Sequence, residues 1–502
     1  MVKEIINKIK KIINNLVVPG KNLSESVIRG GFWVFSLRIV QQLFSLIRLI
    51  ILARILAPHD FGLMGIALLT MTILETFSQT GFQAALIQKK EDIKSHLDAA
   101  WTVLILRGFI LFVILYFIAP YAVVFFNAPE AKPIIQVIGF SILLQAFTNI
   151  GVIYFHKELE FNKEFIYQFA GTLADFIVTV STVLILRNVW ALVFGLLAGN
   201  LIRFIVSYII YPYRPHFSLD LDKAKELFEF GRWVLGSSIL IFLITQGDDI
   251  FVGKLLGAAA LGFYQLAYRI SNIPATEITH VISRVTFPAY SKLQDDLPKL
   301  REAYLKVLQL TAFLSFPIAG LIFVLASDFT RIFLGEKWMP IVPAMQILCI
   351  FGIARSLAGT YGSLFLGTRN QKLTTITSFI KLILLAILIY PLTKKWGIVG
   401  TAIATTLPVF ASQSYGFYKV SKILQCKLRD FLLPFFIPII GVVFMLPLSY
   451  IIKKLLLPDI LIFTIDIIIG TVIYLAFIFY ISKHYKIYDV MKTVRKVIKG
   501  LR

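Results

Sequence analysis

Apolar stretches of about 20 residues recur from near one end of the chain to the other, with short connections between them. A helix of that length crosses about 30 Å of hydrocarbon, where every backbone polar group must be satisfied inside the protein. Hydrophobic residues make up 58% of the 502 residues and charged residues only 16%. The sequence therefore predicts an all-α polytopic membrane protein with no room for a soluble domain between the spans.

The apolar pattern predicts about fourteen transmembrane helices. The expected spans are 31–54, 61–88, 98–125, 131–155, 165–186, 189–212, 230–256, 259–283, 305–327, 340–366, 371–392, 396–419, 431–452 and 459–481. The second, which holds Glu75, and the eighth, which holds Pro274, fit this pattern least well.

One unit of the sequence occurs twice. The segment GFWV at 31–34 returns about 200 residues later as GRWV at 231–234. Pairs in register include Gly31/Gly231, Trp33/Trp233, Arg54/Lys254, Leu56/Leu256 and Gly62/Gly262. Because each copy holds an even number of spans, both copies enter the membrane from the same side. We expect two six-helix bundles related by a pseudo-two-fold axis along the membrane normal, facing each other across a cavity.

The predicted domain organisation follows this repeat. It comprises a cytoplasmic amphipathic N-terminal segment at 1–30, an N-terminal six-helix bundle at 31–212, a cytoplasmic linker at 213–229, a C-terminal six-helix bundle at 230–419, two additional transmembrane helices at 431–481 and a basic cytoplasmic tail at 482–502. Apolar residues at helical spacing within the first 20 positions, interrupted by Asn14 and Asn15, favour a helix on the membrane surface over a signal peptide.

The net charge of +22 would suggest a nucleic-acid partner for a soluble protein. Here the cations sort by side of the membrane instead: with the N-terminus inside, roughly 32 Lys and Arg are cytoplasmic and about 9 lie outside. This bias predicts a multi-pass protein of the cytoplasmic membrane with both termini in the cytoplasm and with no nucleic-acid partner.

The sequence contains no recognisable catalytic or metal-binding constellation. It has no nucleotide-binding loop, no Gly-x-Ser-x-Gly elbow and no His or Cys cluster with metal-ligand spacing. Cys349 lies in an expected span and Cys426 in a loop, which argues against a disulfide. We expect neither an enzyme nor a cofactor.

Polar residues form a stripe along the first expected span. Arg38, Gln41, Gln42, Ser45 and Arg48 step by three or four residues and so lie on one side of an otherwise apolar helix. Charged side chains are costly in lipid, and they usually pair with each other or line a wet interior. Two arginines and two glutamines exceed what one structural pair requires, so the stripe is expected to face the cavity.

Other charged residues also fall within expected spans. The cations are Arg107, Arg203, Arg232, Arg269, Arg355 and Lys381, and the acids are Glu75, Asp175, Asp248, Asp249, Glu277 and Asp466. Each has a structural alternative, because residues near helix ends can extend to the interface and Asp248 or Asp249 can pair with Lys254.

An excess of cations in the cavity suits an anionic cargo, since arginine pairs bidentately with phosphate oxygens where water is excluded. A lipid linked through pyrophosphate fits, with its isoprenoid tail left in the bilayer at the gap between the bundles. The predicted substrate ligands are Arg38, Gln41, Gln42, Arg48, Arg269 and Arg355, and the predicted ion- or proton-coupling residues are Glu75, Asp248 and Asp249.

Three segments carry a family resemblance: ILARILAPHDFG at 51–62, QAALIQ at 83–88 and DDIFVGKLLG at 248–257 with LGFY following at 261–264. They resemble polysaccharide-exporting flippases of the Wzx type, in the multidrug/oligosaccharidyl-lipid/polysaccharide superfamily. The resemblance implies a twelve-plus-two helix fold that moves a polyprenyl-diphosphate-linked oligosaccharide from the cytoplasmic to the outer leaflet by alternating access. Such cargo serves O-antigen, exopolysaccharide or teichuronic-type polymers.

By position, the resemblance favours Arg38, Arg48, Asp248 and Arg269 as head-group ligands, with Glu75 as an ion or proton site. It also implies membrane lipids and the polymerase or glycosyltransferase machinery as partners. The sequence leaves three alternatives open: a cation-coupled multidrug exporter of the same superfamily, a membrane-bound polysaccharide polymerase or ligase, and a structural partner of the glycan machinery. The first would need an acidic cavity, and the second a large outer loop.

Overall fold

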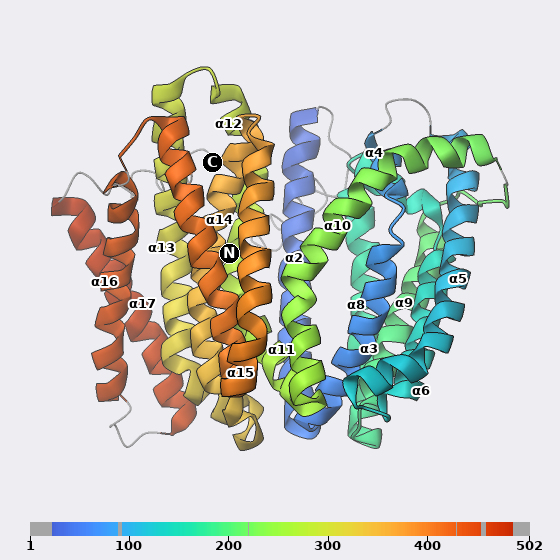
Figure 1. Cartoon of the computed structure of the whole chain (residues 1–502), viewed down its shortest axis with the longest axis horizontal. Coiled ribbons are helices and arrows are strands. Elements are labelled where there is room, and N and C mark those ends of the chain that lie inside the picture. Colours follow the sequence, from blue (N-terminus) through green and yellow to red (C-terminus); the bar gives the residue numbers. More distant parts are fainter. Residues whose placement is uncertain (1–22, 89–92, 219, 428, 453–457, 485–502) are drawn as a thin grey trace, which may run out of the picture. The chain divides into compact units, whose positions relative to one another are not determined.

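The computed structural model describes residues 23–88, 93–218, 220–427, 429–452 and 458–484, and every regular element in these ranges is a helix (Figure 1). The chain divides into two compact units, Met1–Leu243 and Ile244–Arg502. The first contains α2 (Leu23–Ile55), α3 (Pro58–Phe77), α4 (Phe82–Gln88), α5 (Lys94–Phe126), α6 (Ala131–Ala146), α7 (Ile153–Lys157), α8 (Phe161–Leu186), α9 (Trp190–Ile210) and the start of α10 (Leu221–Leu256).

The second unit contains the end of α10 and seven further helices. They are α11 (Ala258–Ser271), α12 (Ile273–Leu293), α13 (Leu297–Phe329), α14 (Val342–Gly367), α15 (Gln371–Leu424), α16 (Arg429–Ile452) and α17 (Asp459–His484), with a π-helical turn at Thr330–Leu334 and a 3-10 turn at Glu336–Ile341 between α13 and α14. Because α10 begins at Leu221, it includes part of the expected 213–229 linker, and the domain boundaries stay a prediction.

Nine helices in the described ranges are long and apolar enough to cross a membrane, or ten if one bent pair counts as a single span. The prediction of an all-α polytopic membrane protein is confirmed, whereas the count of fourteen stays a prediction. The predictions of a surface helix at 1–22 and of a basic tail at 485–502 lie outside the described residues.

Close packing of α8 on α9 builds the first unit. Gly195 and Gly199 lie one helical turn apart on α9, where Gly199 faces Gly171 of α8 and Gly195 faces Thr179 of the same helix. A Cβ added to Gly195 would lie 1.7 Å from the Thr179 hydroxyl oxygen, and one added to Gly199 would lie 3.0 Å from the Gly171 carbonyl oxygen. Small residues allow such backbones to approach closely in a membrane, where no hydrophobic force drives helices together.

A sharp break divides the fourth expected span, since α6 and the helical segment that begins at Ile150 meet at 69°. The buried Asn149 satisfies the backbone at this break: its Oδ1 accepts from the Gly151 N–H at 2.9 Å, and its Nδ2 donates to the Tyr213 carbonyl at 2.6 Å. One amide side chain thus joins the broken span to the segment that follows α9.

In the second unit α14 packs against α11, α12, α13 and α15 (Figure 1). Its large buried residues Tyr361 and Phe365 join Tyr304 of α13, Tyr290 of α12 and Phe431 of α16 in one core cluster. The fully buried aromatic rings in this cluster fix the spacing of the helices around α14.

The 54-residue α15 is a hairpin of two helices rather than one straight rod. Trp396 and Gly397 leave helical geometry, and Gly397 has a φ of 58°, which favours glycine. The Thr393 and Thr401 hydroxyls lie 2.9 Å apart across the turn, in hydrogen-bond contact. This break lies between the expected spans 371–392 and 396–419, so a turn was predicted at this place.

Candidate functional site

A cavity of about 50 Å³ in the second unit is lined by three charged side chains from three helices. Asp248 comes from α10, Arg355 from α14 and Lys381 from the first half of α15. The rest of the polar lining consists of Thr245 of α10, Tyr268 of α11 and Thr405 of α15. Such a volume holds about one to three water molecules or one small ion, and is too small for a sugar. We call this the charged cavity.

The carboxylate of Asp248 is buried, with the residue 3% exposed. Its Oδ2 accepts a hydrogen bond of 2.7 Å from the hydroxyl of the fully buried Tyr264, whereas its Oδ1 has no hydrogen-bond partner among the described residues. A buried acceptor left unsatisfied costs about 1–3 kcal/mol. Asp248, a residue that lines the charged cavity, therefore carries one buried oxygen without a hydrogen bond within the described part of the chain.

Arg355 forms the cationic side of the cavity. Its Nη1 donates to the Tyr268 hydroxyl at 3.0 Å and lies 3.5 Å from the Asn272 Oδ1. The packing of Tyr268 on Phe351, with ring centroids 5.7 Å apart, connects the two helices that carry these groups. The ring and the guanidinium thus fix each other beside the cavity.

Asp249 and Arg269, two further predicted site residues, are not among the residues that line the charged cavity. Asp249 follows Asp248 on α10 and is turned away by about 100°, and its Oδ2 accepts from the Gln265 side chain at 3.1 Å. Arg269 is exposed near the end of α11. Of the residues predicted in the second half, the cavity therefore brings together Asp248 and Arg355.

In the first unit, Arg48 of α2 pairs directly with Asp175 of α8: the Arg48 Nη1 donates to the Asp175 Oδ2. The other oxygen of Asp175 accepts from the Thr179 hydroxyl at 3.1 Å. Both side chains are about three-quarters buried, at 26% and 23% exposed. This predicted substrate ligand is therefore engaged in a two-helix contact.

The predicted stripe on α2 does not present a single face. Gln41 lies near Thr172 of α8, 3.5 Å from its hydroxyl, on the side that also carries Arg48. Phe44 packs on the same helix, against Phe176 at 4.9 Å between centroids. Gln42 is exposed and Arg38 is half-buried. Within the stripe, Gln41 and Arg48 therefore contact α8, and Gln42 and Arg38 lie beside that contact.

Glu75, the predicted coupling residue of α3, is half-buried near the end of that helix. Its neighbour in space is Arg107 of α5, whose Nη2 donates to the Glu75 carbonyl oxygen and to the Ser78 hydroxyl, each at 2.9 Å. The Arg107 Nε donates to the Ser78 carbonyl at 2.8 Å. Arg107 thus caps the end of α3, where carbonyl groups lack helical partners.

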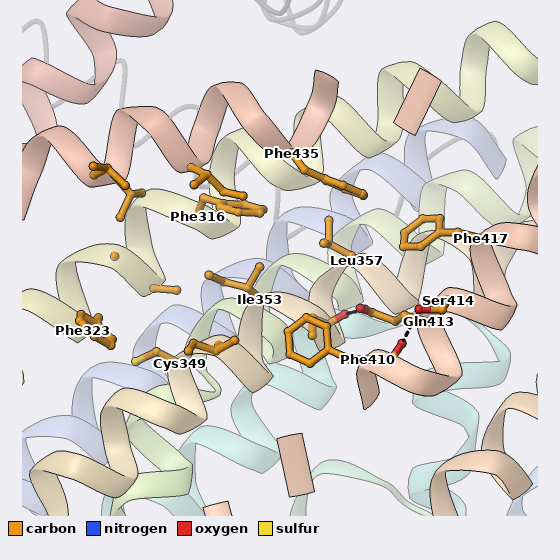
Figure 2. Close-up of a pocket in the computed structure, with 17 residues that line it drawn as sticks. Phe316, Phe323, Cys349, Ile353, Leu357, Phe410, Gln413, Ser414, Phe417 and Phe435 are labelled. Atoms are coloured by element: carbon orange, nitrogen blue, oxygen red, sulfur yellow. Dashed lines mark hydrogen bonds between the residues drawn. The ribbon is translucent and has the colours of Figure 1, made fainter. Parts of the chain in front are cut away.

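A second cavity, of about 490 Å³ and almost wholly apolar, lies in the second unit between α13, α14, α15 and α16. Figure 2 shows Phe316, Phe410, Phe417 and Phe435 around it. Of its two polar residues, Gln413 donates to the Ala354 carbonyl, and Ser414 donates to the Phe410 carbonyl at 3.1 Å. We call this the apolar cavity; its hydrogen-bonding capacity is largely used within the protein.

Sequence reasoning named Lys381 and Asp175 only as charges within spans and did not assign Tyr264 or Tyr268 a role. The two tyrosines are four residues apart on α11, a spacing that places both on one helical face. That spacing was the available signal, and it points to the side of α11 that faces Asp248. The apolar cavity had no sequence signal, because apolar residues dominate all of the spans.

Comparisons with known proteins agree with this architecture. A family model described as polysaccharide biosynthesis protein matches residues 51–343. The chain is 27% identical over 429 residues to the lipopolysaccharide biosynthesis protein WzxC of Escherichia coli K12, covering 83% of this chain and 85% of that protein. It is 30% identical over 470 residues to an uncharacterized membrane protein in the cps region of Klebsiella pneumoniae, covering 91% and 96%.

Among solved structures, the lipid II flippase MurJ in an inward closed conformation is similar with a TM-score of 0.73 at 18% identity. The match covers 90% of this chain and 99% of that protein. At this identity the likeness concerns the fold alone: a multi-helix transporter fold shared along almost the whole chain.

Proposed function

The chain belongs to the polysaccharide biosynthesis protein family, and from this membership we propose that it is a flippase for a polyprenyl-diphosphate-linked oligosaccharide. It moves this lipid from the cytoplasmic to the outer leaflet by alternating access and so supplies cell-surface polysaccharide synthesis. The match of the family model over residues 51–343, in a chain rich in membrane-length helices, is the observation that carries the proposal. The family resemblance predicted from the sequence is confirmed.

The apolar cavity supports a lipid as the cargo. Its volume of about 490 Å³ falls in the range of small-molecule sites, about 300–1,000 Å³, and its lining offers little for a polar drug or a sugar to bind. An isoprenoid chain needs only apolar contact. We propose that part of the polyprenyl tail occupies this cavity while the head group crosses elsewhere.

For the diphosphate we propose the cations predicted from the sequence, with different roles. Arg38 is half-buried, and Arg269 and Gln42 are exposed. Arg48, Gln41 and Arg355 contact other helices, so they would bind cargo only by exchanging those partners. Arginine suits this role because its planar fork matches two phosphate oxygens at once.

The coupling of transport to an ion gradient belongs to the same proposal. Carboxylates within a membrane are the groups most able to bind H⁺ or Na⁺. We propose Asp248 as the foremost of these groups, because its free Oδ1 and its burial fit an exchange site, with Asp249 and Glu75 as further candidates. The cavity between the two six-helix bundles, which the sequence repeat predicts, stays a prediction.

We further propose that both termini lie in the cytoplasm and that the flipped lipid is received by polymerase or glycosyltransferase machinery. A transporter role, with no covalent chemistry, accounts for the family and for the charged and apolar cavities without any catalytic group. Cysteine substitutions at Tyr121 and Asp459, both exposed, report on orientation: we expect an impermeant thiol reagent added outside cells to label both.

Lipid analysis of a strain that lacks this chain tests the function. We expect lipid-linked oligosaccharide to accumulate where only a cytoplasmic reagent reaches it, and surface polymer to fall. Complementation by the wild-type chain restores the polymer. Accumulation in the outer leaflet would assign the chain a later step, and unchanged glycolipid together with increased sensitivity to cationic drugs would favour a multidrug exporter.

A further inference from the structure

The charged cavity carries unequal charge. One carboxylate, Asp248, faces two cations, Arg355 and Lys381, in a space of about 50 Å³ within a membrane protein. Charges interact strongly there, because little water screens them. Asp249 is next in sequence, but it is held by Gln265 on another side of α10 and does not line the cavity. With all three groups ionised, the lining has one positive charge too many.

Only one of the two cations can lose its charge. Arginine stays protonated in proteins, and Arg355 is further held by the Tyr268 hydroxyl at 3.0 Å. Lysine is a compact point charge that gives up its proton when buried, which is why it serves as an acid or a base in many sites. Asp248, with Tyr264 on one oxygen and the other free, can receive a second donor.

We propose that Lys381 is a proton-exchange site of this transporter, with the Asp248 carboxylate as the partner that its protonated form binds. In one state the Lys381 amine is neutral, and the negative charge of Asp248 balances the positive charge of Arg355. In the other state Lys381 Nζ takes up one proton from water, bonds to the free Asp248 Oδ1 and competes with Arg355. The ligand is a proton, and the inference deepens the coupling part of the proposed function.

The groups around Lys381 support this assignment. The charged and titratable side chains at or beside the cavity are Asp248 and Asp249 of α10, Tyr264 and Tyr268 of α11, and Arg355 of α14. The tyrosines are engaged as a donor to Asp248 and as an acceptor from Arg355. Lys381 is the cation of the cavity whose charge can change while both of those hydrogen bonds persist.

The exchange links α15 to α10, the helix in which one compact unit ends and the other begins. Asp248 lies five residues after Leu243, the last residue of the first unit. A bond made or broken at Asp248 therefore acts on the segment that joins the units. Protonation of one lysine can in this way bias the equilibrium between two conformations of the transporter.

The first test measures conformation without cargo. Cys349→Ala and Cys426→Ser remove the natural cysteines, and Tyr121→Cys with Asp459→Cys place one spin label in each unit for distance measurements in nanodiscs at about pH 6 and pH 9. We expect the distance distribution to change with pH in the parent. The change should vanish in Lys381→Met and in Lys381→Arg, which fixes the charge. Lys372 is an exposed lysine on the same helix, so Lys372→Met is the matched control and should respond to pH like the parent.

An unchanged pH response in Lys381→Met, or no response in the parent, overturns the proposal. A response to chloride rather than to pH that is lost in Lys381→Met also overturns it, in favour of an anion held between Lys381 and Arg355. Size-exclusion profiles verify folding, and Lys381→Arg provides a second variant should Lys381→Met fail to assemble.

The second test uses proteoliposomes with a fluorescent polyprenyl-diphosphate-linked sugar. A pH difference of one unit shifts the steady-state distribution by up to about tenfold if one proton is coupled. We expect Lys381→Met to equilibrate the lipid but to lose this shift. Retention of the full shift contradicts the inference. Absence of flipping by the wild type would contradict the proposed function, while the spin-label result would still decide the role of Lys381.

Discussion

The two units carry opposite charges at one position of the sequence repeat. Arg48 on α2 of the first unit and Asp248 on α10 of the second are in register when the chain is aligned on its repeat. Arg48 pairs directly with Asp175, whose other oxygen is taken by Thr179. Asp248 keeps a free oxygen and shares a cavity with Arg355 and Lys381.

This contrast separates two uses of a charge in a membrane. A fully paired charge holds two helices together, and breaking such an ion pair leaves an uncompensated ion. A charge beside a cavity, with bonding capacity unused, can exchange partners during a conformational cycle. The first unit thus has a fixed contact at the place where the second has a changeable one, and the following variants test that difference.

The largest effect is expected for Asp175→Ala, because it leaves the Arg48 guanidinium without its carboxylate. We expect a loss of about 2 kcal/mol, less than for a fully buried pair because each side chain is about one-quarter exposed. Chemical unfolding in detergent measures the loss. The exchanged pair Arg48→Asp with Asp175→Arg should recover part of it, and equal losses in single and exchanged variants would deny that the pair is a fixed contact.

Gly195→Ala should come next. The added Cβ would lie 1.7 Å from the Thr179 hydroxyl oxygen, so that Thr179 must turn away from Asp175 or α9 must move. Overpacking of this kind costs about 1–3 kcal/mol, and we expect a loss toward the lower end because the Thr179 hydroxyl can turn away. The same unfolding measurement applies, with Gly31→Ala as the control, because its Cβ would meet no atom of the described residues within 4 Å. Equal stability of the two variants would rule out the close α8–α9 contact.

Tyr264→Phe removes the hydroxyl that donates to Asp248 Oδ2. Leaving a second buried oxygen unsatisfied should cost about 1–2 kcal/mol while the ring packing remains. Thermal unfolding in nanodiscs measures it. If Tyr264→Phe matches the parent, then the carboxylate has other donors and the charged cavity is differently arranged.

The smallest change in stability is expected for Lys381→Met. Removing the surplus cation of the charged cavity should alter stability by less than about 1 kcal/mol, in either direction. Arg48→Met in the first unit should cost clearly more, since it strands Asp175. A loss in Lys381→Met as large as that in Arg48→Met would make the two sites alike and remove the basis of the comparison.

The sequence predicted the elements that depend on local pattern. Every expected span coincides with a helix or a pair of helices, and the turn at Trp396 and Gly397 lies where two spans were divided, because only glycine readily adopts the φ of 58° found there. The break near Asn149 was missed, since the broken segment remains apolar throughout and its hydrogen bonds come from a distant side chain and from the chain after α9.

The candidate site depended on contacts that periodicity does not encode. The sequence predicts one stripe that includes Gln41 and Gln42, but neighbours on a helix differ by about 100°, so that Gln41 reaches α8 while Gln42 is exposed. The partner of Arg48 lies 127 residues further along the chain, and only the packing of α2 on α8 identifies it. The sequence predicts Asp248 and Arg355 as site residues, a role that stays a prediction, but the cavity that joins them to Lys381 is visible only in the tertiary structure.

Purified protein in liposomes with a fluorescent polyprenyl-diphosphate-linked oligosaccharide tests the central claim most directly. A lectin confined to the outside reports the fraction of head groups in the outer leaflet over time. The account predicts that protein-containing vesicles expose the inner pool much faster than protein-free vesicles do. It also predicts that filling the apolar cavity with Ser414→Phe slows this exposure without loss of folding. Exposure at the protein-free rate, by a folded wild-type chain, would contradict it.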